Sequence, residues 1–434
     1  MKLDLATYPV RDVSFSDQTR YADGVLEINK EELLALILED KRVSEAAIDV
    51  AFPGDQTRIV NVRDVVEPRI KVAGSGCVFP GILGPVEHVG EGRTHRLAGV
   101  TVTVSAEYKP TILSGTAAQI SSILDMWGPA AKVTPFGSTI NIVPIIRLVD
   151  DVTELEAHAA IQSVELKLAR RLAETVIDTS TEDVECFELS DVDPALPRVV
   201  YIDSVMTNWQ APHSLVAYYG LPIRESLPSL IHPNEFLDGV LTSDARIGSA
   251  GNTFTWGWMN PPVVLKLLKE HGKRLNFLGV ILQRTRFETE HGKQVTATCT
   301  AQMAKLLKAD GAIVTRTVPS GANFVDVMLT VQACEKKNVK TVLLTPEWGG
   351  KDGTDLPLVF YVPEATAMVS TGSTDREFKV QAPTKVVGVG AEGLVQLYPG
   401  ARPFSPWSEL TVDNNSIAGA CDWWGESHDT RIGY

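Results

Sequence analysis

The second half of this 434-residue chain alternates between strand-like and helix-like segments, and this alternation constrains the fold more than any other feature. Residues 198–206, RVVYIDSVM, form an apolar run rich in β-branched residues, which is typical of a buried strand. Similar runs follow, separated by segments in which apolar residues recur at helical spacing: LNFLGVILQ, GAIVTR, KTVLLTP and AMVSTG. A strand–helix–strand order with short connections predicts a three-layer α/β domain built on a parallel sheet.

Ligands of such sheets gather beyond the carboxyl ends of the strands. In this sequence those ends carry Arg284, Arg316 and Glu347, which we take as candidate substrate-binding residues. Either arginine can pair with a substrate carboxylate through its planar guanidinium. Glu347 has two open interpretations, a side chain in a ligand pocket or a solvated loop charge.

The first half of the chain has a different pattern. Residues 1–150 consist mainly of alternating or β-branched runs separated by Gly and Pro, which predicts a β-rich N-terminal domain. Thr153, with Glu156 three residues later, forms a capping-box pattern, and apolar residues then recur at helical spacing. We therefore expect a helical connector over residues 151–195 and the α/β domain over residues 196–434.

Composition and charge exclude several classes of protein. A net charge of -14 argues against nucleic-acid binding, because phosphates repel an acidic surface. The sequence has no signal-peptide pattern and no run of eighteen apolar residues, so we expect a cytoplasmic protein without membrane contact. Its five cysteines are far apart and form no CxxC pair, which predicts free thiols and gives no support for a metal site.

The segment GVGAEG, residues 388–393, matches the GxGxxG pattern of dinucleotide-binding loops. Such a loop needs a long helix directly after it, so that the helix N-terminus faces the pyrophosphate. Pro399 and Pro403 interrupt the stretch that follows. We therefore expect a plain turn here.

The segment DARIGSAGNTFTWGWMNPP, residues 244–262, is rich in glycine and costs backbone entropy to fix. Two interpretations are open, a tight packing turn or a place where the backbone itself reacts. Trp256 and Trp258 alternate around Gly257 as residues at a strand edge do, and packing, a subunit interface or a ligand wall would each explain them.

His213 lies in NWQAPHSLVAYYG, a loop-like segment that also contains Tyr218. It is either a buried histidine with its hydrogen bonds satisfied or an acid–base or substrate-orienting residue. A metal-dependent lyase or hydrolase built from His213, Glu347 and scattered ligands is a further alternative, although their spacing does not support a metal site.

From end to end the chain resembles the precursor of the smaller subunits of component B of glycine, sarcosine and betaine reductases, to which the D-proline reductase proprotein is related. The resemblance rests on the order and spacing of several segments, none of which is diagnostic alone. These segments are MKLDLATYPVRDV, DVVEPRIKV, VFPGILG, VGEGRTH, LPSLIHPNEFLDGVL, HGKRLNFLGVIL and KTVLLTPEWGGKDG.

The resemblance implies an activity and a mechanism. Precursors of this family cleave themselves at a cysteine, which becomes a pyruvoyl group at the start of the new chain. The pyruvoyl carbonyl condenses with a substrate amine, and a thiol or selenol on a separate large subunit displaces the amine from carbon. The resemblance therefore implies a hetero-oligomer that acts reductively on a small amine or amino acid.

This sequence departs from the family at the cleavage position. No cysteine lies between Cys186 and Cys299, and the position that matches most nearly is Ser249. A serine hydroxyl can attack the preceding carbonyl, that of Gly248, to give an ester; elimination and hydrolysis would then leave a pyruvoyl end and ammonia. Gly248 gives access to that carbonyl and tolerates strained geometry.

The resemblance thus makes Gly248, Ser249 and His213 the candidate catalytic residues. Asn252 and Tyr218 join the two arginines and Glu347 as candidate substrate-binding residues. The same serine supports an alternative, in which the chain stays uncleaved and shapes or stabilises the site of a catalytic partner.

Overall fold

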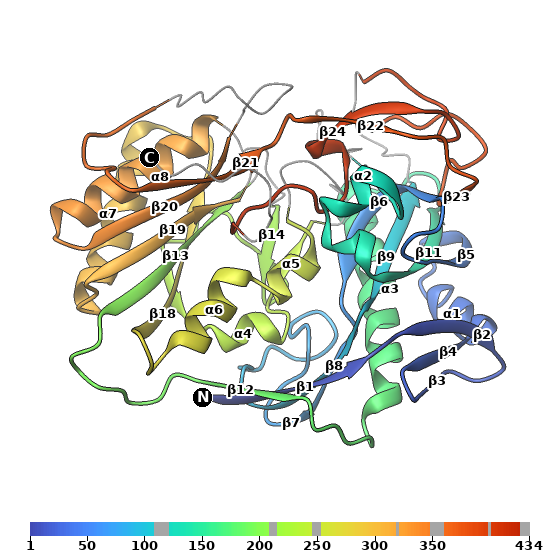
Figure 1. Ribbon diagram of the computed structural model, residues 1–434, viewed down its shortest axis with the longest axis horizontal. Helices are drawn as coiled ribbons and strands as arrows, with labels where there is room; N and C mark the ends of the chain where they lie inside the picture. The colour runs from blue at the N-terminus through green and yellow to red at the C-terminus, as the bar shows by residue number, and fades with distance from the viewer. Residues whose placement is uncertain are drawn as a thin grey trace.

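The computed structural model describes residues 1–107, 121–207, 215–244, 253–317, 321–347, 360–397 and 401–425, with the side chains at 322 and 347 left aside. These residues form a mixed α/β structure, which confirms the fold class expected from the sequence. One sheet with two long helices lies on one side of the molecule, and a group of mainly β elements lies on the other (Figure 1). The strand β14 and the helix α5 lie between them.

The sheet in the second half has the order β16-β18-β13-β19-β20-β21. Its strands are β13 (Arg198–Met206), β16 (Ser229–Ile231), β18 (Asn276–Thr285), β19 (Gly311–Arg316), β20 (Lys340–Glu347) and β21 (Met368–Ser373). All neighbours are parallel except β16, which pairs antiparallel with β18. The expected parallel strands are therefore present, and their carboxyl ends lie along one edge.

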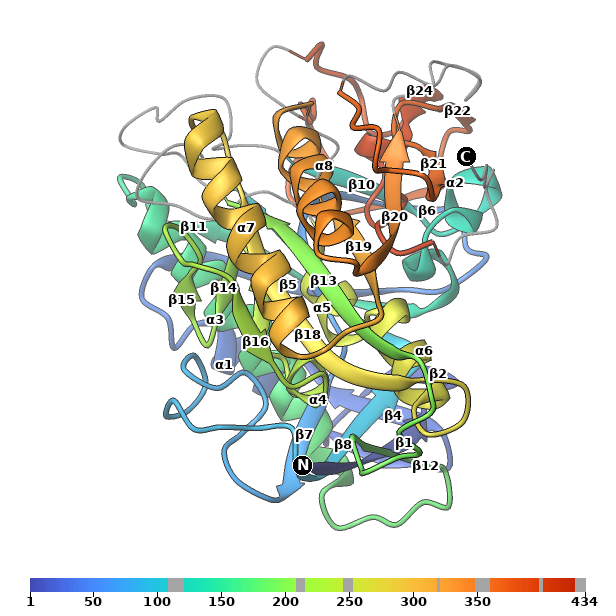
Figure 2. The ribbon, with the colours of Figure 1, turned by 90° about the vertical axis from the view of Figure 1, so that its left-hand side faces the viewer.

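Two helices cover one face of this sheet, α7 (Glu290–Leu306) and α8 (Gly321–Lys336), and Figure 2 shows both in front of the strands. Val200 and Ile202 of β13 pack toward them in a core with Val327 and Met328. The opposite face carries Tyr201 and packs against α6 (Pro262–Glu270) and the shorter helices α4 (Asn234–Leu237) and α5 (Thr255–Met259). Alternation along β13 thus separates two apolar cores.

The β-rich side contains two larger sheets and a small one. The first has the order β12 (Val184–Glu188), β1 (Lys2–Pro9), β8 (Gly92–Ala98), β7 (Arg69–Ala73). The second has the order β10 (Ser122–Asp125), β6 (Thr57–Val66), β9 (Val100–Glu107), β11 (Ile140–Leu148), β5 (Val43–Ala51). The small sheet is β2 (Asp12–Ser16), β4 (Val25–Asn29) and β3 (Arg20–Ala22).

The remaining elements are short apart from one helix. They are the sheet β15 (Leu221–Pro222), β14 (Val216–Tyr218), β17 (Leu241–Ser243), the pair β22 (Glu377–Val380) and β24 (Leu410–Asp413), the strand β23 (Lys385–Val387), the helices α1 (Lys30–Ile37), α2 (Gly128–Lys132) and α3 (Glu154–Ala173), and the 3-10 turns η1 (Pro135–Ser138), η2 (Glu174–Val176) and η3 (Asn414–Ser416).

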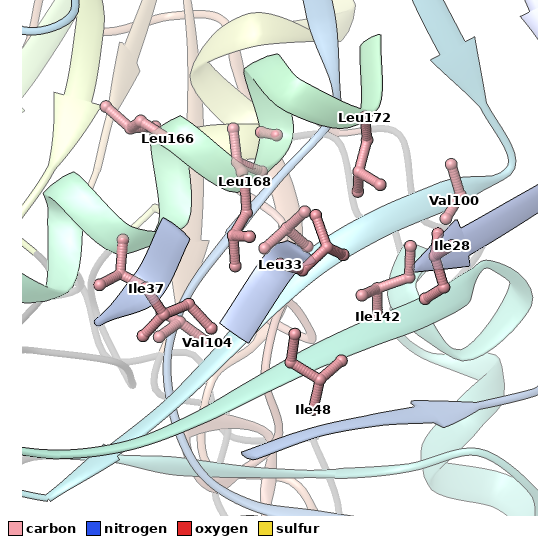
Figure 3. Packing of buried hydrophobic residues seen from close by; sticks show 14 of the residues in the cluster. Ile28, Leu33, Ile37, Ile48, Val100, Val104, Ile142, Leu166, Leu168 and Leu172 are labelled. Carbon is pink, nitrogen blue, oxygen red and sulfur yellow. The ribbon is translucent and has the colours of Figure 1, made fainter. Parts of the chain in front are cut away.

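The long helix α3 begins at the predicted capping box, in which Thr153 and Glu156 bond reciprocally. Its apolar side packs against the β-rich sheets. Leu168 and Leu172 belong to the same apolar cluster as Ile142 of β11 and Val100 of β9 (Figure 3). The predicted division into a domain, a connector and a second domain stays a prediction, and α3 shares its core with the first 150 residues.

The last part of the chain returns to the β-rich side. β23 adds to β6 as a parallel neighbour, and the backbone of Gly388 follows with a φ of 120°. A Cβ at Gly388 would lie 2.4 Å from the carbonyl oxygen of Val60, so only glycine fits this turn. The segment GVGAEG is a turn that packs on β6, as predicted.

A buried arginine holds this return segment in place. Arg58 is fully buried and pairs with Asp125 at 2.7 Å. Its remaining hydrogen bonds go to carbonyl oxygens of the return segment, those of Gln381, Pro406 and Ser408, each at 2.9 Å. One side chain therefore joins β6, β10 and residues more than 300 positions later in the chain.

We expect Arg58→Ala to lower the free energy of unfolding by about 3–5 kcal/mol, because Asp125 and the three carbonyls lose their donor inside the protein. Urea unfolding followed by circular dichroism measures this. Arg20→Ala is the matched control, since its pair with Glu27 is exposed to solvent and should contribute little. Equal stability of the two variants would contradict the role given to Arg58.

Candidate functional site

The segment between β17 and α5 is the loop that the sequence singled out, and its two described ends are tied together. The backbone N–H of Ser243 donates to Oγ1 of Thr255 at 3.0 Å. The hydroxyl of Ser243 donates to the carbonyl oxygen of Thr253, and Nε1 of Trp258 donates to that hydroxyl at 3.1 Å. We call Ser243, Thr253, Thr255 and Trp258 the loop base.

Trp256 and Trp258 lie in the helix α5, and the expected strand edge is wrong. The helix starts here because a carboxylate meets its first turn: Asp64 of β6 accepts from the backbone N–H of Thr255 at 2.8 Å. Its other oxygen accepts from the hydroxyl of Thr255 at 2.5 Å. A carboxylate at the N-terminus of a helix satisfies donors that the helix itself leaves open.

Asp64 shares its site with a second acid, Glu165 of α3. Both are buried, and burial raises the pKa of Asp64 to about 6. Burial and the neighbouring charge of Asp64 raise the pKa of Glu165 well above its ordinary value. Neither carboxyl oxygen of Glu165 meets a donor from another described residue. Glu165 therefore keeps its proton and can donate it to Asp64, so that the two acids titrate as a pair.

Glu165 belongs to a polar stripe on α3 that faces β17. Gln162 donates to the hydroxyl of Thr242 at 3.2 Å, and Nδ1 of His158 lies 3.5 Å from a carboxylate oxygen of Asp244. The sequence analysis missed these residues. Their signal was the spacing of four and three positions between 158, 162 and 165, which places three polar side chains on one face of a helix.

A second hydrogen-bonded group lies at the sheet. Nε1 of Trp424 donates to the hydroxyl of Tyr201 at 3.0 Å, and that hydroxyl lies 2.6 Å from Oγ1 of Thr315. The hydroxyl of Thr315 donates to Asp203 at 3.3 Å. Tyr201 and Asp203 are two positions apart on β13, so they point to the same face of the sheet.

The indole of Trp424 connects this group to the loop base. It packs edge-to-face on Trp258, with ring centroids 5.7 Å apart and an interplanar angle of 81°. Gly257 allows this approach, because a Cβ there would lie 3.1 Å from Trp424 and 2.9 Å from Thr253. The junction between the sheet and the β-rich side is thus a continuous assembly of buried polar and aromatic groups.

Asp203 is the acid of the sheet group and is completely buried. Burial raises its pKa to about 7, and the nearby hydroxyls of Tyr201 and Thr315 oppose this only in part. Its second oxygen, Oδ2, has no hydrogen-bond partner among the residues that the structure describes. Perturbed acids of this kind gather at functional sites.

Tyr218, a predicted substrate-binding residue, lies on β14, which pairs antiparallel with β17. Its hydroxyl donates to Glu235 at 2.8 Å, and the hydroxyl of Tyr219 donates to the same carboxylate oxygen at 3.1 Å. Burial raises the pKa of Tyr218. The residue lies beside the strand that leads into the loop, with its hydroxyl directed at Glu235.

The two predicted arginines lie on opposite faces of the sheet. Arg316 bonds to Thr345 at 2.7 Å and to Asn323 of α8 at 2.9 Å, on the face that α7 and α8 cover. Arg284 is the register partner of Val205, which points to the opposite face, and it pairs with Glu288 at 2.6 Å. Only Arg284 therefore shares a face with Asp203 and Trp424.

The other predicted site residues are Gly248, Ser249, Asn252 and His213, which lie outside the described residues. Glu347 ends β20, and only its backbone is described. Their proposed roles stay predictions.

Within the described ranges, no three His, Cys, Asp or Glu side chains come close enough together to hold a metal ion. All five cysteines lie in these ranges and are free, as predicted. In the same part of the chain no helix has both the length and the apolar character needed to cross a bilayer.

Comparison with known proteins gives one family. The family model of glycine/sarcosine/betaine reductase component B subunits matches residues 1–428. The chain is 31% identical over 428 residues to the glycine reductase complex component B subunits alpha and beta of Acetoanaerobium sticklandii, covering 97% of each chain.

Two proteins of Peptoclostridium acidaminophilum are also similar. The sarcosine reductase complex component B subunit alpha is 31% identical, with 90% of each chain covered. The betaine reductase complex component B subunit alpha is 33% identical, with 89% of this chain and 88% of that one covered. No solved structure gave a significant match.

The shared proton of Asp64 and Glu165 predicts how stability depends on pH. Between its ordinary pKa of 4.5 and its raised folded pKa, Glu165 holds a proton that the unfolded chain has released, so stability falls as pH rises. We expect Glu165→Gln to make the free energy of unfolding fall less steeply with pH, by about 1.4 kcal/mol per pH unit, because glutamine still donates to Asp64 but does not ionise.

Urea unfolding between pH 6 and 8 measures the slope above the pKa of Asp64, which is about 6. Glu182→Gln, at an exposed position, is the control and should keep the wild-type slope. A wild-type slope in Glu165→Gln would show that no proton is shared there.

Proposed function

This chain belongs to the family of glycine/sarcosine/betaine reductase component B subunits, and from that premise we propose that it is a subunit of a complex that reductively cleaves the C–N bond of a small amino acid or amine. The observation that carries the proposal is the match along almost the whole chain, which includes both ends of the predicted loop. The relatives are components of reductase complexes named for glycine, sarcosine or betaine, and these three compounds are the substrates we propose.

We propose further that the reactive group of this subunit arises from Ser249. The surroundings of the loop base fit such a group. Asp64, Glu165 and Asp203 are buried acids close to the loop base or linked to it through Trp258 and Trp424. Thr253 lies four positions after Ser249, and its Oγ1 has no hydrogen-bond partner among the described residues. A pyruvoyl carbonyl would supply an electron sink for a bound amine.

Other residues of the chain would bind the substrate and move protons. Of the two candidate arginines, Arg284 fits the carboxylate of an amino-acid substrate better, because it lies on the face of the sheet that packs against Trp424 and Trp258. Its present partner, Glu288, would give way to the substrate carboxylate. His213, Asn252 and Tyr218 keep their proposed roles in proton transfer and substrate binding.

The chain needs a partner for this reaction. Reductive cleavage of a C–N bond takes a nucleophile that can later be reduced, and the proposed one is a thiol or selenol on a separate large subunit. Three of the five cysteines are unsuited to be this nucleophile, because burial raises the pKa of Cys77, Cys186 and Cys334, which keeps them as thiols. A hetero-oligomer follows from the proposal.

Intact-mass measurement of the protein from its native host tests the reactive group. We expect two fragments, residues 1–248 and 249–434, with the second blocked to Edman sequencing because it begins with a carbonyl. Ser249→Ala should give one uncleaved chain. Ser249→Cys should still be cleaved, because a thiol can replace the hydroxyl in attacking the carbonyl of Gly248.

Ser229→Ala, at an exposed position on β16, is the control and should be cleaved like the wild type. A single full-length mass for wild-type protein in a complex that still releases amine would refute the Ser249 proposal. The alternative would then hold, in which the uncleaved subunit shapes the site of its partner.

A further inference from the structure

Asp203 occupies an unusual place in the sheet. It lies on β13, between β18 and β19, three residues before the carboxyl end of the strand. The side chain is completely buried, and one of its two carboxyl oxygens has no hydrogen-bond partner within the described ranges. Leaving a buried acceptor unpaired costs about 1–3 kcal/mol.

The hydrogen bonds around Asp203 have a fixed direction. An indole N–H can only donate, so Tyr201 accepts from Trp424 and turns its own hydrogen elsewhere. The nearest acceptor is the hydroxyl of Thr315 at 2.6 Å, which in turn donates to Oδ1 of Asp203. Oδ1 is thus occupied as an acceptor. When Asp203 is protonated, the hydrogen therefore lies on Oδ2, the oxygen that no other described residue contacts by a hydrogen bond.

The residues directly opposite Asp203 on the neighbouring strands carry no charge. Opposite it, β18 carries Leu282 and β19 carries Thr315. On its own strand the other ionisable group that points to the same face is Tyr201, and burial raises the pKa of that phenol, so it stays neutral.

The charged groups on the other elements of this face have partners of their own or face solvent. Arg284 of β18 pairs with Glu288. Asp422, in the segment that carries Trp424, accepts from the backbone N–H groups of Trp424 and Gly425. Lys266 and Lys269 of α6 are exposed, and α5 contains no ionisable residue. Burial therefore acts on Asp203 without an opposing positive charge and raises its pKa to about 7.

We propose that Asp203 is the general acid of the reaction at this junction, and that its Oδ2 donates a proton to the nitrogen that leaves the substrate. The proposal rests on the function proposed above. As the C–N bond of glycine or sarcosine breaks, its electron pair goes to nitrogen, which takes the proton from Oδ2 and leaves as a neutral amine; the quaternary nitrogen of betaine becomes neutral with the electron pair alone and takes no proton. Carbon bonds to the thiolate or selenolate of the partner subunit, and Asp203 becomes a carboxylate that Thr315 stabilises until water returns the proton.

A matched acid on the other face of the same sheet provides the control. Asp326 of α8 is also buried, also has one carboxyl oxygen without a partner among the described residues, and has its pKa raised by burial to about 6. It differs in being paired with Lys293 and in lying on the face that α7 and α8 cover. Asp326→Asn therefore removes a buried acid on the opposite face of the sheet from Asp203.

The test measures amine release from glycine and sarcosine by the complete complex as a function of pH. A general acid works in its protonated form, so the wild-type rate should fall as pH rises through about 7. We expect Asp203→Asn to lower the rate about 100-fold or more and to remove this fall, while Asp326→Asn keeps both the rate and the pH profile. An unchanged profile in Asp203→Asn would overturn the proposal.

Thr315→Val provides a second variant that keeps the acid. It removes the donor to Oδ1, which destabilises the carboxylate, so the fall in rate should move to higher pH. A residue with only a packing role would not move the profile. A profile in Thr315→Val that coincides with the wild type would contradict the assignment even if Asp203→Asn folds poorly.

Infrared difference spectra of the purified chain separate this inference from the proposed function, because they need neither the partner nor a substrate. We expect a carboxylic-acid C=O band that disappears as pH rises through about 7, is missing from Asp203→Asn and is kept in Asp326→Asn. Absence of the band in the wild type overturns the assignment of Asp203 as the proton donor. A present band in a complex that releases no amine supports the proton on Asp203 and overturns the proposed function instead.

Discussion

Burial of Asp64 beneath the first turn of α5 is the constraint on which the junction depends. A buried carboxylate must find donors, and Thr255 supplies two, its backbone N–H and its hydroxyl. The same hydroxyl accepts from the backbone of Ser243, at the end of β17. Both ends of the loop are thereby set by a residue that lies 191 positions before Thr255 in the chain. The geometry of a local segment is fixed here by a long-range interaction.

Three buried acids near one junction would be costly if each were ionised without a cation. The structure resolves this in two ways. Asp64 and Glu165 hold a proton between them, which removes one charge and gives the remaining one a donor. Asp203 receives its hydrogen bond from the end of a chain of hydroxyls that starts at the indole of Trp424. Both oxygens of Asp64 accept hydrogen bonds from Thr255, whereas one oxygen of Asp203 has no partner among the described residues, as a group that acts on a ligand requires.

Elements that depend on residues close in sequence were predicted correctly, whereas elements that depend on contacts between distant residues were not. The capping box at Thr153 and the alternation behind the parallel sheet depend on residues close in sequence, and both are present in the structure. Trp256 and Trp258 were expected at a strand edge because they alternate, but the bonds from Thr255 to Asp64 impose a helix. The stripe on α3 was overlooked since polar residues on a helix usually face water, and only the fold shows that Gln162 meets Thr242 of β17 and that Glu165 is buried beside Asp64 of β6.

The loop base and the sheet group act as one assembly because tryptophan offers only a single donor. Trp258 uses its N–H on Ser243, and Trp424 uses its N–H on Tyr201. If either indole changed its partner, the buried hydroxyl that it bonds now would lose a donor, so both rings are held in place. The contact between the two rings therefore fixes how the loop base lies relative to β13. Gly257 belongs to the same constraint, since any side chain there would meet Trp424. An acid on β13 is therefore held in a defined relation to the ends of a loop whose backbone is expected to react.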